Sequence, residues 1–311
     1  MIAAVAVLER AHAQDWPIRP VHVLVPFAAG GSTDVAARLV GEYISRTLGQ
    51  QFVIENRTGA NGNLAIDAVA KSAPDGYTIL ITTDAFASNP HVYKVGYDAL
   101  KDFTPVIQLS RQPVVLAVHP SLGVSTLAEL IERAKREPGM GFGTGSGFGS
   151  GQSIVAYWFA RIAGIKLDQV AYRGGGQAIN DLIAGHVKIG SLGSTPLIPH
   201  YRAGVLKLLA QSTATRSSSL PDVPTFQEAG IAGLVFEQWI GMFAPAGTPP
   251  AIVARLNAEI GKAIEQPATR DNLLKAAQDP VGGSPEAFGH LVRDDFATFG
   301  RLVKELDIKV N

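Results

Sequence analysis

The feature that most constrains this chain is a strand-like apolar run that leads directly into a glycine pair and a helical pattern. Val21 to Val25 are followed by Pro26-Phe27-Ala28-Ala29-Gly30-Gly31-Ser32-Thr33-Asp34. Glycines let the backbone turn tightly and approach a ligand closely. The first N–H groups of a helix have no internal acceptor and carry the positive end of the helix dipole. The sequence therefore predicts a strand, a turn and a helix start that can hold an anion without a basic side chain.

Two better-known phosphate motifs do not fit this turn. It lacks the G-x-G-x-x-G spacing of dinucleotide-binding proteins and the Gly-Lys-Ser or Gly-Lys-Thr of phosphate loops. A glycine pair between a strand and a helix is also ordinary turn chemistry in α/β proteins. The turn alone leaves both interpretations open.

Similar turns recur further along the chain. Six glycines lie between positions 141 and 151, just before the helical pattern from Ile154 to Ala163. A third turn, Tyr172 to Gly176, follows a predicted strand, and a fourth, Gly193 to Pro196, follows the run 187–192. The Gly-Ser composition of the second turn is also typical of a flexible linker. Because the glycine turns fall in two α/β units, we interpret them as the two sides of one ligand-binding cleft.

Alternation of strands and helices predicts an α/β fold of parallel sheets covered by helices. The length of 311 residues and a 46% hydrophobic content allow one or two domains with sizeable cores. Three helical patterns near the C-terminus are expected to return to the first domain. We therefore expect a first domain of residues 14–117 plus 237–311 and a second of 118–236, with hinge crossings near 118 and 236.

The N-terminus and the charge balance indicate an exported protein that does not bind nucleic acid. Ile2 to Leu8 is a short apolar run, and Ala11-His12-Ala13 has the form of a signal-peptidase site. We expect residues 1–13 to be an incomplete signal peptide and the protein to be periplasmic, although a cytoplasmic N-terminal extension is the alternative. The 27 basic and 27 acidic residues leave no net field for nucleic acid, and the absence of cysteine excludes disulfides and thiolate chemistry.

Several motifs in order resemble one protein family. They are the Val25 to Asp34 turn, Glu55-Asn56-Arg57-Thr58-Gly59-Ala60-Asn61-Gly62, Pro74-Asp75-Gly76-Tyr77-Thr78, Leu220-Pro221-Asp222-Val223-Pro224-Thr225 and Ala244-Pro245-Ala246-Gly247-Thr248-Pro249. From Trp16 to the end, the chain resembles the Bug family, the extracytoplasmic solute receptors of tripartite tricarboxylate transporters.

The resemblance implies the two-domain, type II periplasmic binding protein fold, which closes over its ligand like a Venus flytrap. It implies capture of a small organic carboxylate, such as a di- or tricarboxylate, an aromatic acid or an acidic amino acid. The expected protein is a monomer without catalytic residues, metal or cofactor. Its expected partners are the membrane permease subunits of a tripartite transporter or, alternatively, the ectodomain of a membrane sensor.

The candidate ligand-binding residues come from both domains. In the first domain we expect the turn at one end of the ligand, Asp34 to stabilise the helix start, and residues after the third strand to form a wall. In the second domain the Gly-Ser segment is expected to take the other end, with four residues near the mouth. The first-domain set is Phe27, Ala28, Ala29, Gly30, Gly31, Ser32, Asp34, Phe86, Ser88 and Asn89. The second-domain set is Gly145, Ser146, Gly147, Ser150, Gly151, Gln152, Tyr172, Arg173, Gly174 and Ser194.

Three positions of the second domain depart from the family pattern. Gly145 stands where the family often has serine, Ser153 where it has histidine, and Gly193 where a larger polar residue is expected. Smaller groups at these positions predict a wider or wetter pocket.

The competing function class is a small α/β hydrolase or transferase. Ser146 and Ser150 have glycine neighbours. However, no G-x-S-x-G elbow stands out in a strand-turn-helix context, and no H-E-x-x-H pair is present. The sequence therefore favours a receptor over an enzyme.

Overall fold

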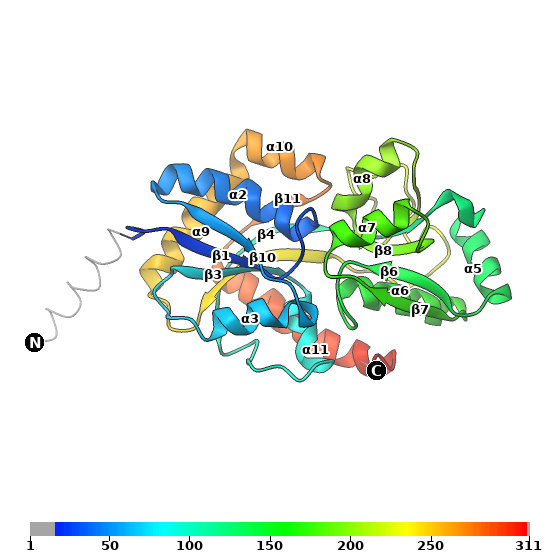
Figure 1. Ribbon diagram of the computed structural model, residues 1–311, viewed down its shortest axis with the longest axis horizontal. Helices are drawn as coiled ribbons and strands as arrows, with labels where there is room; N and C mark the ends of the chain where they lie inside the picture. Colours follow the sequence, from blue (N-terminus) through cyan, green and yellow to red (C-terminus); the bar gives the residue numbers. More distant parts are fainter. Residues whose placement is uncertain (1–15, 310–311) are drawn as a thin grey trace, which may run out of the picture.

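The protein is described by a computed structural model that covers residues 16–309 and contains two β-sheets. The six-stranded sheet has the order β11-β4-β10-β3-β1-β2, and the five-stranded sheet has the order β7-β6-β8-β5-β9. We call each sheet with its helices the first lobe and the second lobe, and Figure 1 shows them side by side.

The strands of the first lobe are β1 (Val21–Val25), β2 (Phe52–Asn56), β3 (Thr78–Thr83), β4 (Phe103–Gln112), β10 (Gln238–Pro245) and β11 (Asp279–Gly282). Its α-helices are α2 (Ser32–Leu48), α3 (Asn63–Ala70), α4 (Ala85–Ser88), α9 (Pro250–Glu265), α10 (Pro267–Lys275) and α11 (Pro285–Glu305). The strands of the second lobe are β5 (Val114–Val118), β6 (Met140–Thr144), β7 (Leu167–Ala171), β8 (Ile189–Gly193) and β9 (Lys207–Gln211). Its α-helices are α5 (Leu127–Arg136), α6 (Gly151–Ala163), α7 (Gly175–Ile183) and α8 (Ser194–Arg202).

Both sheets are mixed rather than purely parallel. β1 pairs in parallel with β2 and β3, whereas β10 runs antiparallel to β3 and β4. In the second lobe β6 is parallel to β7 and β8, but β5 is antiparallel to β8 and β9. The sequence pattern predicted parallel sheets, which holds for the βαβ part of each sheet, whereas the antiparallel direction of β10 and β5 was not predicted.

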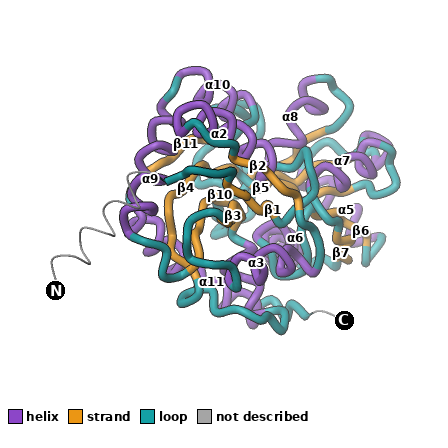
Figure 2. The backbone as a smooth tube through the Cα atoms, turned by 60° about the vertical axis from the view of Figure 1, so that its left-hand side comes forward, coloured by secondary structure: helices purple, strands orange, loops and turns teal. Residues whose placement is uncertain are grey.

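Helices cover both faces of the first sheet. Alternate residues of β1 face opposite ways, so Val21 and Val23 belong to the core beneath α2 and α9, while Leu24 belongs to the core beneath α3 and α11. Figure 2 shows the strands as a central layer between the helices. Burial on both faces explains why these strands are apolar along their whole length.

The C-terminal helices α9 and α11 pack on the sheet of the first lobe. α9 contacts α2 and β4, and α11 packs along β4 with its C-terminal end directed toward the second lobe in Figure 1. The Arg161 guanidinium of α6 donates to the Glu305 carbonyl at that end. No helix within residues 16–309 is long and apolar enough to cross a bilayer.

The chain passes between the lobes earlier than residue 118. β4 ends at Gln112 in the first sheet, and Val114 already pairs with Gly193 in the second sheet. The first crossing is therefore at Pro113, because the apolar run 114–118 is the antiparallel neighbour of β8 rather than the last strand of the first lobe. The return crossing leads into Gln238, which pairs with Gln112.

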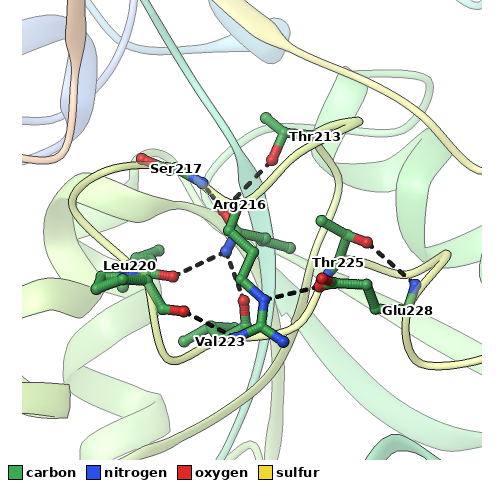
Figure 3. A network of polar contacts seen from close by, with 9 residues as sticks. Thr213, Arg216, Ser217, Leu220, Val223, Thr225 and Glu228 are labelled. Atoms are coloured by element: carbon green, nitrogen blue, oxygen red, sulfur yellow. Dashed lines mark hydrogen bonds and ion pairs between the residues drawn. The ribbon is translucent and has the colours of Figure 1, made fainter.

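A long segment between β9 and β10 has almost no regular structure and is held by polar side chains. The Arg216 Nε atom donates to Glu228 at 2.8 Å, and its Nη1 atom donates to the Pro221 carbonyl at 2.8 Å (Figure 3). Gln211 Nε2 donates to the carbonyls of Leu220 and Val223 at 3.0 and 2.7 Å. The Leu220 to Thr225 motif therefore has a structural role on the second lobe.

A pair of glycine substitutions tests the packing of the central strand β10. At Gly241 an added Cβ would lie 2.1 Å from the Phe288 ring, whereas at Gly261 in α9 nothing lies within 4 Å. We expect Gly241→Ala to lower the free energy of unfolding by about 1–3 kcal/mol through overpacking. The control Gly261→Ala should raise it by about 0.5–1 kcal/mol, because alanine loses less backbone entropy in a helix. Urea denaturation measures both, and equal stabilities would contradict the close packing of Phe288 on Gly241.

Candidate ligand-binding site

The glycine turns of the two lobes are in direct backbone contact. The Ala28 N–H in the β1–α2 turn donates to the Arg173 carbonyl in the β7–α7 turn at 3.0 Å. A Cβ on Gly174 would lie 2.6 Å from that of Ala28, and one on Gly176 would lie 2.5 Å from the Ala29 carbonyl oxygen. Only glycine permits this approach, so the structure is a closed arrangement of the lobes.

An inner cavity lies where the N-termini of α2 and α7 meet. Neither helix has a side-chain cap, and an added Cβ on Gly31 would lie 3.4 Å from the Gly175 nitrogen. The cavity is small, about 20 Å³, which is room for one small group. Its lining is Phe27, Gly31, Ser32, Thr33, Thr83, Gly145, Ser146, Gln152, Gly175, Pro196 and Gln238. Two helix dipoles and their free N–H groups therefore converge on a space without a charged side chain, which suits an anion.

The side chains of the inner cavity supply further polar atoms. Ser146 is buried, and its hydroxyl has no hydrogen-bond partner in the described part of the chain. Gln152 Oε1 accepts from the Gly145 N–H at 2.8 Å, and Gln238 Oε1 accepts from Gln112 Nε2 at 2.8 Å. Because a buried hydroxyl without a partner is costly, the Ser146 Oγ atom is the side-chain donor best placed for a ligand.

A larger outer chamber of about 490 Å³ adjoins the inner cavity, with Phe27 and Ser146 lining both. Its remaining lining is Pro26, Thr58, Gly59, Ala60, Asn61, Gly62, Leu64, Tyr93, Gly147, Phe148, Ala171, Tyr172 and Arg173. Arg173 is the single charged residue in this set. The chamber can thus accommodate the remainder of a ligand whose anionic end lies in the inner cavity.

The Gly-Ser segment is an ordered turn between β6 and α6 rather than a linker, and several of its N–H groups already have protein acceptors. Gly147 N donates to Asn61 Oδ1, and Gly151 N donates to Asp84 Oδ2 at 2.7 Å. Both acceptors belong to the first lobe. These donors therefore hold the lobes together instead of facing the cavity.

Asp34 stabilises the β1–α2 turn on the side away from the inner cavity. Its carboxylate accepts from the Gly30 N–H at 3.0 Å, from Arg38 and from Asn56. Burial acts to raise the pKa of Asp34, but these three donors together hold it below its ordinary value. The Asn56 amide also donates to the Phe27 carbonyl, so the shape of the turn depends on this cluster.

The predicted site residues divide into those that line a cavity and those that support one. The lining residues are Phe27, Gly31, Ser32, Gly145, Ser146, Gly147, Gln152, Tyr172 and Arg173. The others lie behind the lining or between the lobes: Ala28, Ala29, Gly30, Asp34, Asn89, Ser150, Gly151, Gly174 and Ser194.

Phe86 and Ser88 are corrected, because the structure places them in the core. Phe86 stacks on Phe243 with ring centroids 4.4 Å apart, and the Ser88 hydroxyl donates to the Ala85 carbonyl within α4. Both are fully buried and line neither cavity. Asn89 does not line a cavity itself. Its side-chain amide donates to Asn61 and Asn63, and Asn61 lines the outer chamber.

Gly193 does not widen the pocket as expected. An added Cβ there would lie 2.4 Å from Gln112 Nε2 and 2.8 Å from Gln238 Oε1. The two glutamine side chains of the crossing strands fill the space that a larger residue would occupy. Gln238 thereby enters the lining of the inner cavity.

Sequence reasoning missed several lining residues. Gly175 lies inside a predicted turn, whereas Thr83 is the last residue of β3 and Gln238 is the first residue of β10. No local pattern shows that Asn61 and Tyr93 of the first lobe lie opposite Phe148 of the second lobe.

The family model described as "Tripartite tricarboxylate transporter family receptor" matches residues 36–308. The chain belongs to this family. Members of it are binding receptors, so the hydrolase or transferase alternative is not supported. Within residues 16–309 no group of His, Asp or Glu side chains could hold a metal ion.

Relatives and solved structures agree with this assignment. The chain is 34% identical to a protein in the tcbD-tcbE intergenic region of Pseudomonas sp. strain P51, with 95% of this chain and 89% of that protein covered. It is 32% identical to BugT of Bordetella pertussis, with 99% and 96% covered. An R. palustris protein solved with adipate is 35% identical with a TM-score of 0.89, covering 94% and 99% of the two chains. MatC from Rhodopseudomonas palustris, solved with bound malate, is 33% identical with a TM-score of 0.87, covering 93% and 100%.

Replacing Asp34 tests the support of the first turn. We expect Asp34→Asn to lower the free energy of unfolding of this receptor by about 1–3 kcal/mol at pH 7, because charge-assisted hydrogen bonds are lost. A lowered pKa in the folded state means that this contribution exists above about pH 4 and disappears as the pH falls through the folded pKa. Urea titrations at pH 7 and at pH 3 measure the difference. A destabilisation that is equal at both pH values would contradict an ionised Asp34.

Proposed function

We propose that this protein is a periplasmic receptor that captures a small organic carboxylate between its lobes. One carboxylate group would occupy the inner cavity, where it accepts from the free N–H groups of α2 and α7 and from Ser146. The observation that carries the proposal is the convergence of two uncapped helix N-termini on one neutral, enclosed space.

The outer chamber indicates a ligand with a second anionic group. Adipate and malate, the ligands of the two R. palustris structures, both carry two carboxylates. In this chain a second anionic group would extend into the outer chamber toward Arg173. We therefore favour a dicarboxylate over a monocarboxylate.

We also propose that the two lobes are domains joined by a hinge at Pro113 and before Gln238. The pairing of Gln112 with Gln238 at this point supports it, because both crossing strands lie together there. The closed form would be delivered to the permease subunits of a tripartite transporter. A membrane sensor would read the same closed form, and a pull-down with membrane components separates these partners.

The test is calorimetry on the refolded protein with a panel of mono-, di- and tricarboxylates, aromatic acids and acidic amino acids. Refolding removes any ligand retained during purification. Saturable binding of a carboxylate without turnover by mass spectrometry is the expected result. Product formation, or no binding across the panel, would contradict the proposal.

Substitution of Gly31 tests the inner cavity. Gly31 has φ −81°, so a side chain is compatible with its backbone and would project toward Gly175. We expect Gly31→Asp to abolish carboxylate binding, a loss of at least about 100-fold, because a like charge then occupies the anion site. Gly31→Asn has nearly the same size without the charge and should lose less. Retained affinity in a folded Gly31→Asp protein would exclude the inner cavity as the site.

Substitution of Arg173 tests the outer chamber. The Arg173 side chain is exposed, so its ion pair with a ligand is worth about 0–1 kcal/mol, or up to roughly fivefold in affinity. We expect Arg173→Gln to weaken dicarboxylate binding by this factor and to leave a matched monocarboxylate unchanged. An equal effect on both ligands would show that Arg173 does not contact the distal group.

A further inference from the structure

A buried carboxyl group joins the lobes beside the inner cavity. Asp84 follows β3 in the first lobe, directly after the cavity-lining Thr83, and is fully buried. Its Oδ2 atom accepts from the Gly151 N–H at the start of α6, which belongs to the second lobe, at 2.7 Å. A Cβ on Gly151 would lie 2.4 Å from this oxygen and 2.3 Å from the Phe236 ring. The carboxyl is therefore sealed by elements of the opposite lobe and of the crossing segment.

Within the described residues no basic side chain pairs with Asp84, and its charge is favoured by the Gly151 N–H, the positive end of the α6 dipole and the Gln238 side chain. Its Oδ1 atom has no hydrogen-bond partner in the described part of the chain, and no salt bridge involves it there. The groups that face it from other elements are the Gly151 N–H of α6, the Phe236 ring, the Gln238 side chain of β10 and Asp295 of α11. Of these only Asp295 titrates, and it carries the same sign.

The pKa values of the two buried carboxyl groups agree with their burial. Burial raises the pKa of Asp84 to about 7 against the smaller lowering effects of Gln238 and Gly151, and Asp295 raises it further. The pKa of Asp295 is itself raised by burial to about 6, opposed by its hydrogen bond from Trp239 Nε1 at 2.6 Å. An ionised Asp84 in the closed form would be a buried charge near a bound anion, which is unfavourable for both.

We propose that Asp84 is a proton-binding site of the closed receptor, so that the protein takes up a proton as it closes over a carboxylate. In an open form Gly151 moves away with the second lobe, water reaches the carboxyl group, and Asp84 is ionised at neutral pH. Closure removes that water, and the carboxyl is then favoured in its neutral form. The proposal rests on the proposed carboxylate binding and adds a proton as the second ligand of the same closure.

The direction of the pH dependence follows from linkage. A carboxyl whose pKa is higher in the closed form makes closure more favourable as the pH falls from about 7 toward its open-state value, with a plateau above the closed-state pKa. With a closed-state pKa of about 7 and an ordinary open-state value, the Kd should be about tenfold tighter at pH 6 than at pH 8.

The experiment is calorimetry with adipate, or with malate if adipate does not bind, at pH 6 and pH 8 and in two buffers of different ionisation enthalpy. The wild type should show the tenfold change and should take up about half a proton per ligand at pH 7. Asp84→Asn mimics the neutral carboxyl. Because it closes without taking up a proton, it should bind more tightly than the wild type at both pH values, by about 100-fold at pH 6 and about 1000-fold at pH 8. Its residual pH dependence reports the ionisation of the ligand itself.

The matched control is Asp295→Asn. It should keep the pH dependence, with the midpoint moved to lower pH because a negative neighbour of Asp84 is removed. A wild-type Kd that does not change with pH would overturn the proposal, because Asp84 would then have the same environment in both forms. If the dependence of Kd on pH persists in Asp84→Asn and vanishes in Asp295→Asn, the proton binds to Asp295 instead, and the proposal is overturned.

A second arm does not depend on the ligand and separates this proposal from the proposed function. The chain has no cysteine, and an added Cβ on Gly149 would lie 3.2 Å from Val92 Cβ, near disulfide spacing. Gly149 has φ +76°, so a cysteine there is strained, and loss of free thiol in the oxidised Val92→Cys and Gly149→Cys protein is the check that the lobes are locked closed. In this protein labelled with ¹³C at aspartate carboxyls, one signal should titrate near pH 7 and be missing when Asp84→Asn is added. If no carboxylate binds but this signal is present, the proposed function fails and the proton site stands; if the signal is absent, the proton site fails.

Discussion

The structure depends on the close approach of two glycine turns from opposite lobes. The Ala28 N–H reaches the Arg173 carbonyl, and Gly174 and Gly176 leave no room for a side chain at the contact. This backbone contact brings the N-termini of α2 and α7 to one point. Without it each helix start would be an ordinary solvated terminus, and the proposed anion site would be lost.

The two strands that cross between the lobes shape the inner cavity as well as joining the lobes. Gln112 and Gln238 stand opposite each other on the two crossing strands, and Gln112 also accepts from Thr195 at the start of α8. Gln278 donates both to the Ser32 carbonyl at the start of α2 and to Thr195. These buried amides connect the crossing strands to the starts of α2 and α8, so a movement at the proposed hinge would be transmitted to the inner cavity. The intact network stabilises the fold by more than the sum of its separate hydrogen bonds, because losing one bond leaves a buried amide unpaired.

Much of the fold followed from local patterns, whereas the cavity lining followed only in part. The strand 21–25 was predictable because an apolar run before a glycine turn is a property of neighbouring residues. The capping box at the start of α5 is equally local, since Thr126 and Glu129 are three residues apart. Phe86 was misplaced because an aromatic residue after a strand can face either a cavity or the core, and the stacking on Phe243 decides this only in three dimensions. Gly193 was misjudged for the same reason, since the glutamines that fill its space are distant in sequence. The roles of Asp84 and Asn61 were invisible because both act on the opposite lobe.

The measurement that tests the account most directly is a crystal structure of the refolded protein with the carboxylate that calorimetry identifies. We expect closed lobes and a carboxylate group in the inner cavity, with its oxygens about 3 Å from N–H groups at the starts of α2 and α7 and from Ser146 Oγ. A ligand bound outside this cavity, or held there by contacts to one lobe alone, would contradict the central claim.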